Sequence, residues 1–151
     1  MLLKSSDMSP DQLFSVCNSL ALFSWIILVF FTFWKSRVQY LFSIVIILLA
    51  LVYSWLIFSN ISPEGFKNFN TLDRISRLFA NKSLLLAGWI HYLAFDLLTG
   101  IFIVTNARKN DINHWLVVPA LFFTFLLGPF GLLIYFLTRL VKTRTYLQDN
   151  F

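Results

Sequence analysis

LLLAGWIHYLAFDLLTGIFIV, residues 84–104, is the stretch of sequence that decides the fold. It is apolar and long enough to cross a bilayer as a helix, which takes about 20 residues. Two ionisable residues, His91 and Asp96, nevertheless lie near its middle. A charge at bilayer depth costs at least about 2.5–3.5 kcal/mol on insertion scales, so an ionisable residue there indicates a functional site. His91 and Asp96 are therefore the leading candidates for the chemistry of this chain.

The composition of the whole chain indicates an integral membrane protein. Of its 151 residues, 58% are hydrophobic and 13% are charged, whereas soluble domains carry about 25% charged residues. The net charge of +5 comes from lysines and arginines at the ends of apolar segments, which favours contact with lipid headgroups over nucleic-acid binding. The single cysteine, Cys17, excludes an internal disulfide.

Four apolar segments predict one all-α membrane domain over residues 1–151, a bundle of four transmembrane helices. The spans are expected at about residues 11–34, 38–58, 84–104 and 115–140. Between the second and third spans, residues 69–82 place apolar side chains at helical spacing with charged ones opposite. This pattern predicts an amphipathic helix that either lies along the membrane interface or docks as a connector.

The fourth segment contains a break at Gly128-Pro129. Proline at position 129 removes one backbone hydrogen bond and crowds the carbonyl of Phe125, so a bend with a freed carbonyl is expected. Gly128 and Gly131 allow a neighbouring helix to approach closely. The break is either a packing kink or part of a site.

The basic residues predict the orientation. With four spans, the side that carries both termini holds eight lysines and arginines and the other side holds four, so both termini are expected in the cytoplasm. No signal or transit peptide is apparent before the first span, which favours a bacterial inner-membrane protein.

His91 and Asp96 are not expected to contact each other. Five residues on one helix separate them by roughly 140° and about 7.5 Å. Each side chain therefore needs partners on other helices. Asn18 on the first span shares the level of His91, and Gly128-Pro129 shares the level of Asp96.

The remaining candidates surround Asp96. Trp89 lies seven residues earlier and nearly on the same helix face, where it is expected to line a substrate pocket. Thr99, one turn beyond Asp96, and Thr124 on the fourth span are expected to complete this polar pocket. We expect no metal and no cofactor, because the sequence contains no Cys/His cluster and no glycine-rich phosphate loop.

Less specific interpretations stay open for both ionisable residues. His91 fits an interhelical hydrogen bond without a catalytic role. Asp96 fits a protonated carboxyl, a proton-transfer group, or a partner for His91 of a second copy, which would make the protein a homo-oligomer.

The third and fourth segments resemble the abscisic-acid-deficient-4-like family over about residues 70 to 142. The residues that carry the resemblance are WIHYLAFDL at 89–97, His114, Pro119, GPFGL at 128–132 and Arg139. Plant members of the family are chloroplast proteins required to make neoxanthin from violaxanthin. The resemblance implies an intramembrane isomerase of a carotenoid or related isoprenoid, or a factor required for that step, with His91 and Asp96 as its acid–base pair.

Two alternatives remain beside the isomerase. One is a non-catalytic membrane protein that binds a carotenoid or lipid or assists assembly. The other is a proton or ion pathway built on Asp96, which would require an oligomer because one acid in four spans does not make a pore. In every case membrane lipid is the expected surrounding and partner.

Overall fold

The computed structural model describes residues 8–30, 37–62, 65 and 69–144, and these residues form an all-helical fold. The described helices are α1 (Pro10–Phe30), α2 (Arg37–Asn60), α3 (Leu72–Phe79), α4 (Lys82–Lys109), α5 (His114–Leu127) and α6 (Pro129–Thr143). Residues 31–34, the expected end of the first span, lie outside the described residues. Among the residues described, three helices are long and apolar enough to cross a membrane: α1, α4 and the Phe42–Asn60 part of α2. These helices indicate a membrane protein.

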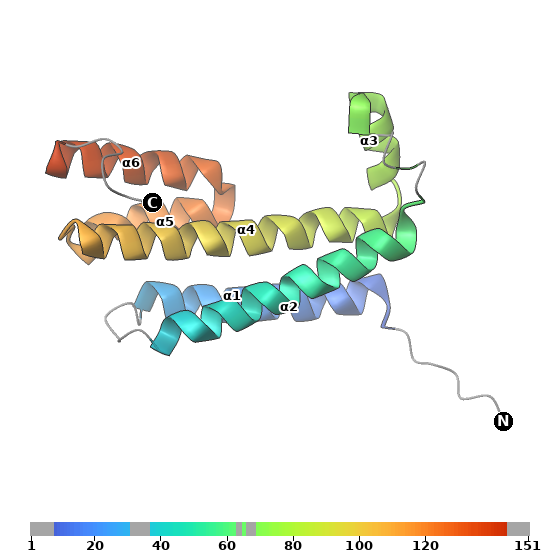
Figure 1. The fold of residues 1–151 in the computed structure, drawn as a ribbon, viewed down its shortest axis with the longest axis horizontal. Coiled ribbons are helices and arrows are strands. Elements are labelled where there is room, and N and C mark those ends of the chain that lie inside the picture. Colours follow the sequence, from blue (N-terminus) through green and yellow to red (C-terminus); the bar gives the residue numbers. More distant parts are fainter. Residues whose placement is uncertain (1–7, 31–36, 63–64, 66–68, 145–151) are drawn as a thin grey trace.

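Helix α4 is the axis of the bundle (Figure 1). Helices α1 and α2 pack along one side of it, and α5 and α6 pack on another. Ile90, Leu97 and Ile103 of α4 are fully buried. Gly100 lets α1 approach so closely that a Cβ atom there would lie 2.7 Å from the Trp25 ring. The helix with the polar residues is therefore also the best-covered one.

The C-terminal part is a helical hairpin, so the prediction of one fourth helix over residues 115–140 is wrong. Helix α5 ends before Gly128, where φ is +48°, and the chain reverses so that α6 runs back beside α5 (Figure 1). Glycine tolerates this backbone conformation, and Pro129 fits the first position of the new helix because the missing N–H is not needed there. Gly128 and Pro129 together reverse the chain, where a proline alone would have bent it.

Close contacts hold the two arms of the hairpin together. A Cβ atom on Gly131 of α6 would collide with the backbone of Ala120 and Thr124 of α5. Without a side chain at position 131, the two helices pack backbone against backbone. This is the close approach expected of small residues between membrane helices.

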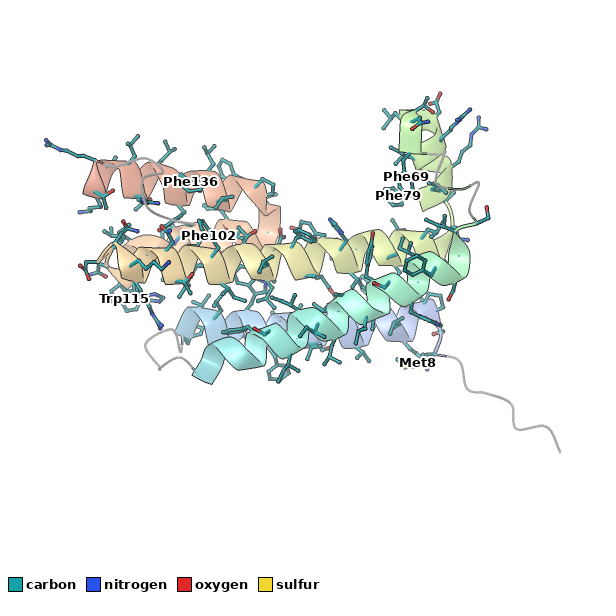
Figure 2. All side chains as sticks on the ribbon, in the orientation of Figure 1. Met8, Phe69, Phe79, Phe102, Trp115 and Phe136 are labelled. Carbon is teal, nitrogen blue, oxygen red and sulfur yellow. The ribbon has the colours of Figure 1, made fainter. Side chains whose placement is uncertain are left out.

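A buried polar cluster holds the open end of the hairpin against α4. The Oδ1 atom of Asn106 accepts hydrogen bonds from the Tyr135 hydroxyl, at 2.5 Å, and from Nη1 of Arg139, at 3.2 Å. All three residues are buried. Phe102 of α4 packs edge-on against Phe136 of α6 beside the cluster, with ring centroids 6.2 Å apart (Figure 2). This cluster attaches the open end of the hairpin, opposite the turn at Gly128, to α4.

The hairpin also changes where the chain ends. Helix α1 begins at one end of the bundle and α6 finishes at the other (Figure 1). The prediction that both termini share one side depends on four crossings and does not follow from this arrangement. Among the described residues, three lysines and arginines lie toward the end where α1 begins and six toward the end where α6 finishes. The charge bias that favoured a cytoplasmic N-terminus is lost.

The amphipathic helix between the second and third spans is present as α3. Thr71 caps it by accepting a hydrogen bond from the backbone N–H of Arg74. The helix projects from the bundle beside the start of α4, with Phe69 and Phe79 near its base (Figures 1 and 2). No residue of α3 is buried, and Leu72 is 81% exposed. The location of α3 along a membrane interface stays a prediction.

Candidate functional site

Asp96 lies midway along α4, directly beneath the tip of the hairpin. The residue is only 7% exposed, and its Oδ2 atom is buried without a hydrogen-bond partner among the described residues. The backbone of Gly128 approaches so closely that a Cβ atom on Gly128 would collide with Oδ1 of Asp96. The expected proximity of Asp96 and Gly128 is therefore present, at the tip of a hairpin instead of a kink within a span.

Tyr92 connects Asp96 to the hairpin. It precedes Asp96 by about one helical turn, and its hydroxyl lies beside the Asp96 carboxyl. The same hydroxyl donates a hydrogen bond of 2.8 Å to the backbone carbonyl of Leu126. That carbonyl is available because α5 ends one residue later and leaves its last carbonyls without helical partners.

An apolar groove of about 530 Å³ between α1, α3 and α4 leads to Tyr92. Phe14, Phe79, Leu85, Leu86, Trp89 and Tyr92 form most of its wall. The rings of Phe14 and Trp89 lie 5.9 Å apart, and those of Trp89 and Tyr92 lie 5.4 Å apart. Asp96 follows these residues on the same face of α4, because the steps from Trp89 to Tyr92 and on to Asp96 are three and four residues. The groove and the carboxyl thus lie on one continuous helix face.

Asn18 orients the aromatic wall of this groove. Its side-chain oxygen accepts a hydrogen bond of 3.0 Å from the indole nitrogen of Trp89, and its Nδ2 donates to the carbonyl of Phe14. The sequence places Asn18 at the level of His91, but its hydrogen-bond partner across the helices is Trp89. Trp89 thus lines the groove and Asn18 holds it from α1, and a substrate-binding role for either residue stays a prediction.

His91 lies on a different face of α4 from Asp96. Its ring is exposed, stacks on Phe95 at 4.5 Å between centroids, and lies 5.5 Å from the ring of Tyr53 on α2. It is not among the residues that line the groove. The structure does not bring His91 and Asp96 together.

The remaining predicted residues serve the helices and the hairpin. The Thr99 hydroxyl donates to the carbonyl of Phe95, and the fully buried Thr124 hydroxyl donates to that of Ala120. Gly131 lies against Thr124, while Pro129 is exposed at the start of α6. The two threonines have their hydroxyls bonded within their own helices, so they shape the region around Asp96 without offering it a partner.

Sequence reasoning missed three polar residues that the structure shows to be important. The sequence pattern predicts no site or packing role for Tyr92, Asn106 or Tyr135. A detectable pattern existed, because Tyr92, Asp96 and Asn106 recur at helical spacing along the face of α4 that contacts the hairpin. The pattern is hard to recognise in the sequence because most of the residues between these three are apolar.

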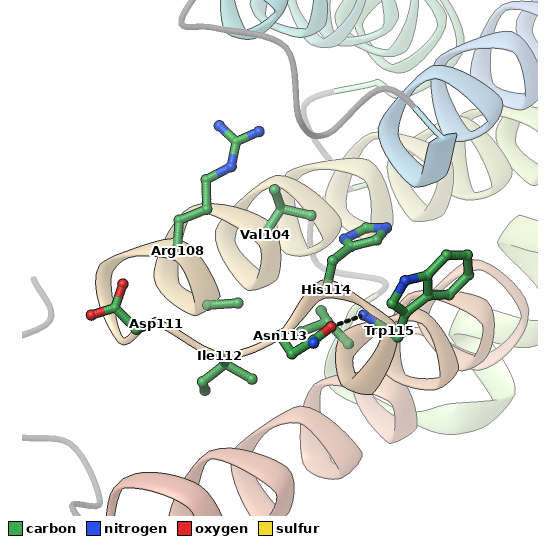
Figure 3. A pocket seen from close by; sticks show the side chains of 9 residues that line it. Val104, Arg108, Asp111, Ile112, Asn113, His114 and Trp115 are labelled. Carbon is green, nitrogen blue, oxygen red and sulfur yellow. Dashed lines mark hydrogen bonds between the residues drawn. The ribbon is translucent and has the colours of Figure 1, made fainter.

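A second hollow, of about 500 Å³, lies where α4 turns into α5 (Figure 3). Arg108, Asp111 and His114 are among the residues that line it. In this turn Oδ1 of Asn113 accepts a hydrogen bond from the backbone N–H of Trp115, and a ring nitrogen of His114 lies 3.0 Å from the carbonyl of Val29. Within the described ranges, no three His, Cys, Asp or Glu side chains come together as a metal site. The hollow is formed by the polar turn between α4 and α5 at the end of the bundle, and Asp96 does not line it.

Comparison with known proteins gives one family. The model of the family described as ABA DEFICIENT 4-like matches residues 12–135. The matched range includes all of α1 and of the groove except Pro10 and Asp11, together with α2, Asp96 and the hairpin tip. No curated protein and no solved structure matches the chain.

Proposed function

This chain belongs to the ABA DEFICIENT 4-like family, and we propose from this premise that it is a membrane-embedded isomerase of a carotenoid or related isoprenoid. The observation that carries the proposal is a buried carboxyl one helical turn beyond Tyr92, the residue at which an apolar groove on the same helix face ends. Asp96 is 7% exposed and shares a helix face with the aromatic wall of that groove. An apolar groove with a small number of polar groups is the usual form of a site for a hydrophobic ligand.

The proposed reaction opens a 5,6-epoxide into an allenic alcohol without net oxidation or reduction. An acid gives a proton to the epoxide oxygen as the C–O bond breaks, and a base removes a proton from the adjacent chain carbon. Asp96 is the source of the proton in the first step, as a neutral acid, and its final acceptor in the second, as the carboxylate that the first step leaves. The protein returns to its starting state after one cycle.

We assign the proton transfer to Asp96 and not to the pair of Asp96 and His91. His91 is exposed on another face of α4 and packs against Phe95 and Tyr53. A ligand in the groove would contact Trp89 and Tyr92, and Asp96 lies one helical turn beyond Tyr92. The hairpin tip at Gly128 covers the carboxyl, which keeps water away from it.

The direct test uses purified protein in lipid vesicles with violaxanthin as the probe. We expect an isomer of equal mass, detected by chromatography, at a rate above that in empty vesicles. Violaxanthin recovered unchanged from active preparations of the protein would contradict the isomerase proposal for this substrate.

The aromatic wall favours a second candidate, a non-catalytic protein that binds a carotenoid or other lipid. Phe14, Trp89 and Tyr92 form a series of ring contacts that would hold a polyene without any chemistry at Asp96. This candidate predicts a pigment that co-purifies and is recovered chemically unchanged. Formation of product by the pure protein would exclude it.

A further inference from the structure

Tyr92 occupies the position between the groove and the buried carboxyl. It lines the groove, its ring lies 5.4 Å from that of Trp89, and its hydroxyl lies beside Asp96. Its hydrogen bond of 2.8 Å to the Leu126 carbonyl fixes where its one proton points. Because a phenol has one proton to donate and lone pairs that accept, the Tyr92 oxygen is then free to accept a proton from Asp96.

The environment of Asp96 favours a neutral carboxyl that can donate its proton. Its Oδ2 atom is buried and has no hydrogen-bond partner within the described part of the chain. A charged carboxylate at this depth would need such partners, whereas a neutral carboxyl needs one acceptor. With Asp96 neutral, the groups would form an ordered chain, from the Asp96 carboxyl through the Tyr92 hydroxyl to the Leu126 carbonyl.

We propose that Tyr92 is a catalytic residue that carries protons between Asp96 and a ligand in the groove. This inference rests on the proposed isomerase function. The Tyr92 hydroxyl turns from the Leu126 carbonyl to the ligand oxygen and gives its proton, while Asp96 gives a proton to the Tyr92 oxygen. When the ligand carbon releases its proton, the same path returns one proton to the Asp96 carboxylate, so protons balance over the cycle.

The same hydroxyl also attaches the hairpin tip to α4. While Tyr92 donates to Leu126, the tip is fixed over Asp96. While it donates to the ligand, the Leu126 carbonyl loses this partner. Proton transfer and the attachment of the tip are therefore linked through one hydrogen atom.

The test compares Tyr92→Phe with Tyr53→Phe, a matched control on α2 next to His91. Infrared spectra of the protein in lipid give the C=O stretch of protonated carboxyls, and the band that Asp96→Asn removes is assigned to Asp96. We expect Tyr92→Phe to shift this band, since the phenol oxygen no longer accepts from Asp96, and Tyr53→Phe to leave it in place. With violaxanthin as the probe, Tyr92→Phe should lower turnover by about 100-fold, within the range usual for proton transfer, and Tyr53→Phe by less than about 2-fold.

The two measurements separate the relay from the isomerase function. An unshifted band in Tyr92→Phe, or the absence of any band removed by Asp96→Asn, would overturn the relay whether or not turnover is seen. Full turnover by Tyr92→Phe would overturn the relay while the isomerase function stands. A lack of turnover in every variant would overturn the function for this substrate, and the infrared band would still decide whether Asp96 gives its proton to Tyr92.

Discussion

Gly128 determines both the backbone conformation of the hairpin turn and the packing of the turn against Asp96. Its φ of +48° is unfavourable for other residues, and its Cα lies against the Asp96 carboxyl. Any larger residue at this position must therefore strain the turn and displace the acid at the same time. The turn and the candidate active site depend on the same missing side chain.

Replacing Gly128 with alanine should destabilise the protein and misplace Asp96. Positive φ alone costs about 1–3 kcal/mol, and the collision with Oδ1 of Asp96 adds to it. Thermal unfolding in detergent measures the loss, with Gly88→Ala as the control because its Cβ would meet only the Phe79 ring, at 3.1 Å. Equal stability of the two variants would show that the tip does not press on Asp96.

His91 should matter far less than Asp96. Because its ring packs against Phe95 and Tyr53 outside the groove, His91→Gln should lower violaxanthin turnover by less than about threefold, well below the 100-fold or more of a proton-transfer group. His91→Phe, which keeps an aromatic ring at this position, serves as the structural control. A loss in His91→Gln as large as in Asp96→Asn would restore His91 to the catalytic pair.

At the scale of elements, α6 depends on Asn106 for its position against α4. Asn106→Leu removes the acceptor for Tyr135 and for the buried Arg139, and an unsatisfied buried donor costs about 1–3 kcal/mol. Hydrogen exchange of α6 amides should become faster, while α1 amides stay protected. Tyr135→Phe is the milder control, since it removes one donor and leaves the acceptor. Unchanged exchange in Asn106→Leu would show that the hairpin does not need this attachment.

Most helices of the fold were predictable from the sequence. Long apolar runs and the mixed pattern before residue 82 gave α1, α2, α3 and α4 close to their positions, since length and periodicity are local properties. The sequence also singles out Asp96 as a candidate site residue, because a carboxyl in an apolar run has no local explanation.

The reversal at Gly128 was not predictable in the same way. Residues 115–140 are continuous in hydropathy, and a glycine and proline in such a run are compatible with a kink as well as with a turn. The reversal is stabilised by the close packing of Gly131 against Thr124 across the turn and by the long-range hydrogen bond between Tyr135 and Asn106. The hydrogen bond of Tyr92 was equally unpredictable, since the Leu126 carbonyl lacks a helical partner only because α5 ends at Leu127 and the chain turns back.

At the scale of the molecule, we predict that α1, α2 and α4 cross the membrane and that α5 and α6 form a hairpin within it, so that Met8 and Lys142 face opposite sides. Single cysteines at Met8 and Lys142, introduced with Cys17→Ser as the background, should react from opposite sides with a maleimide that does not cross membranes. Both positions are exposed in the structure, and Cys17 is buried. Labelling of both positions from one side would support four spans and contradict the hairpin.

The groove and the covered carboxyl require the complete bundle, because their residues come from different helices. Helix α1 supplies Phe14 and Asn18, α4 supplies Trp89, Tyr92 and Asp96, and the hairpin covers the acid. A ligand from the lipid phase would enter along aromatic rings and meet its proton donor at the middle of the membrane. This arrangement is what the proposed isomerase requires.

The most direct test of that account is violaxanthin turnover by Asp96→Asn in lipid vesicles, measured beside the unchanged protein. Asparagine keeps the size of the side chain but cannot give up and recover a proton, so we predict a loss of at least about 100-fold with thermal unfolding little changed. Turnover by Asp96→Asn equal to that of the unchanged protein would contradict the account.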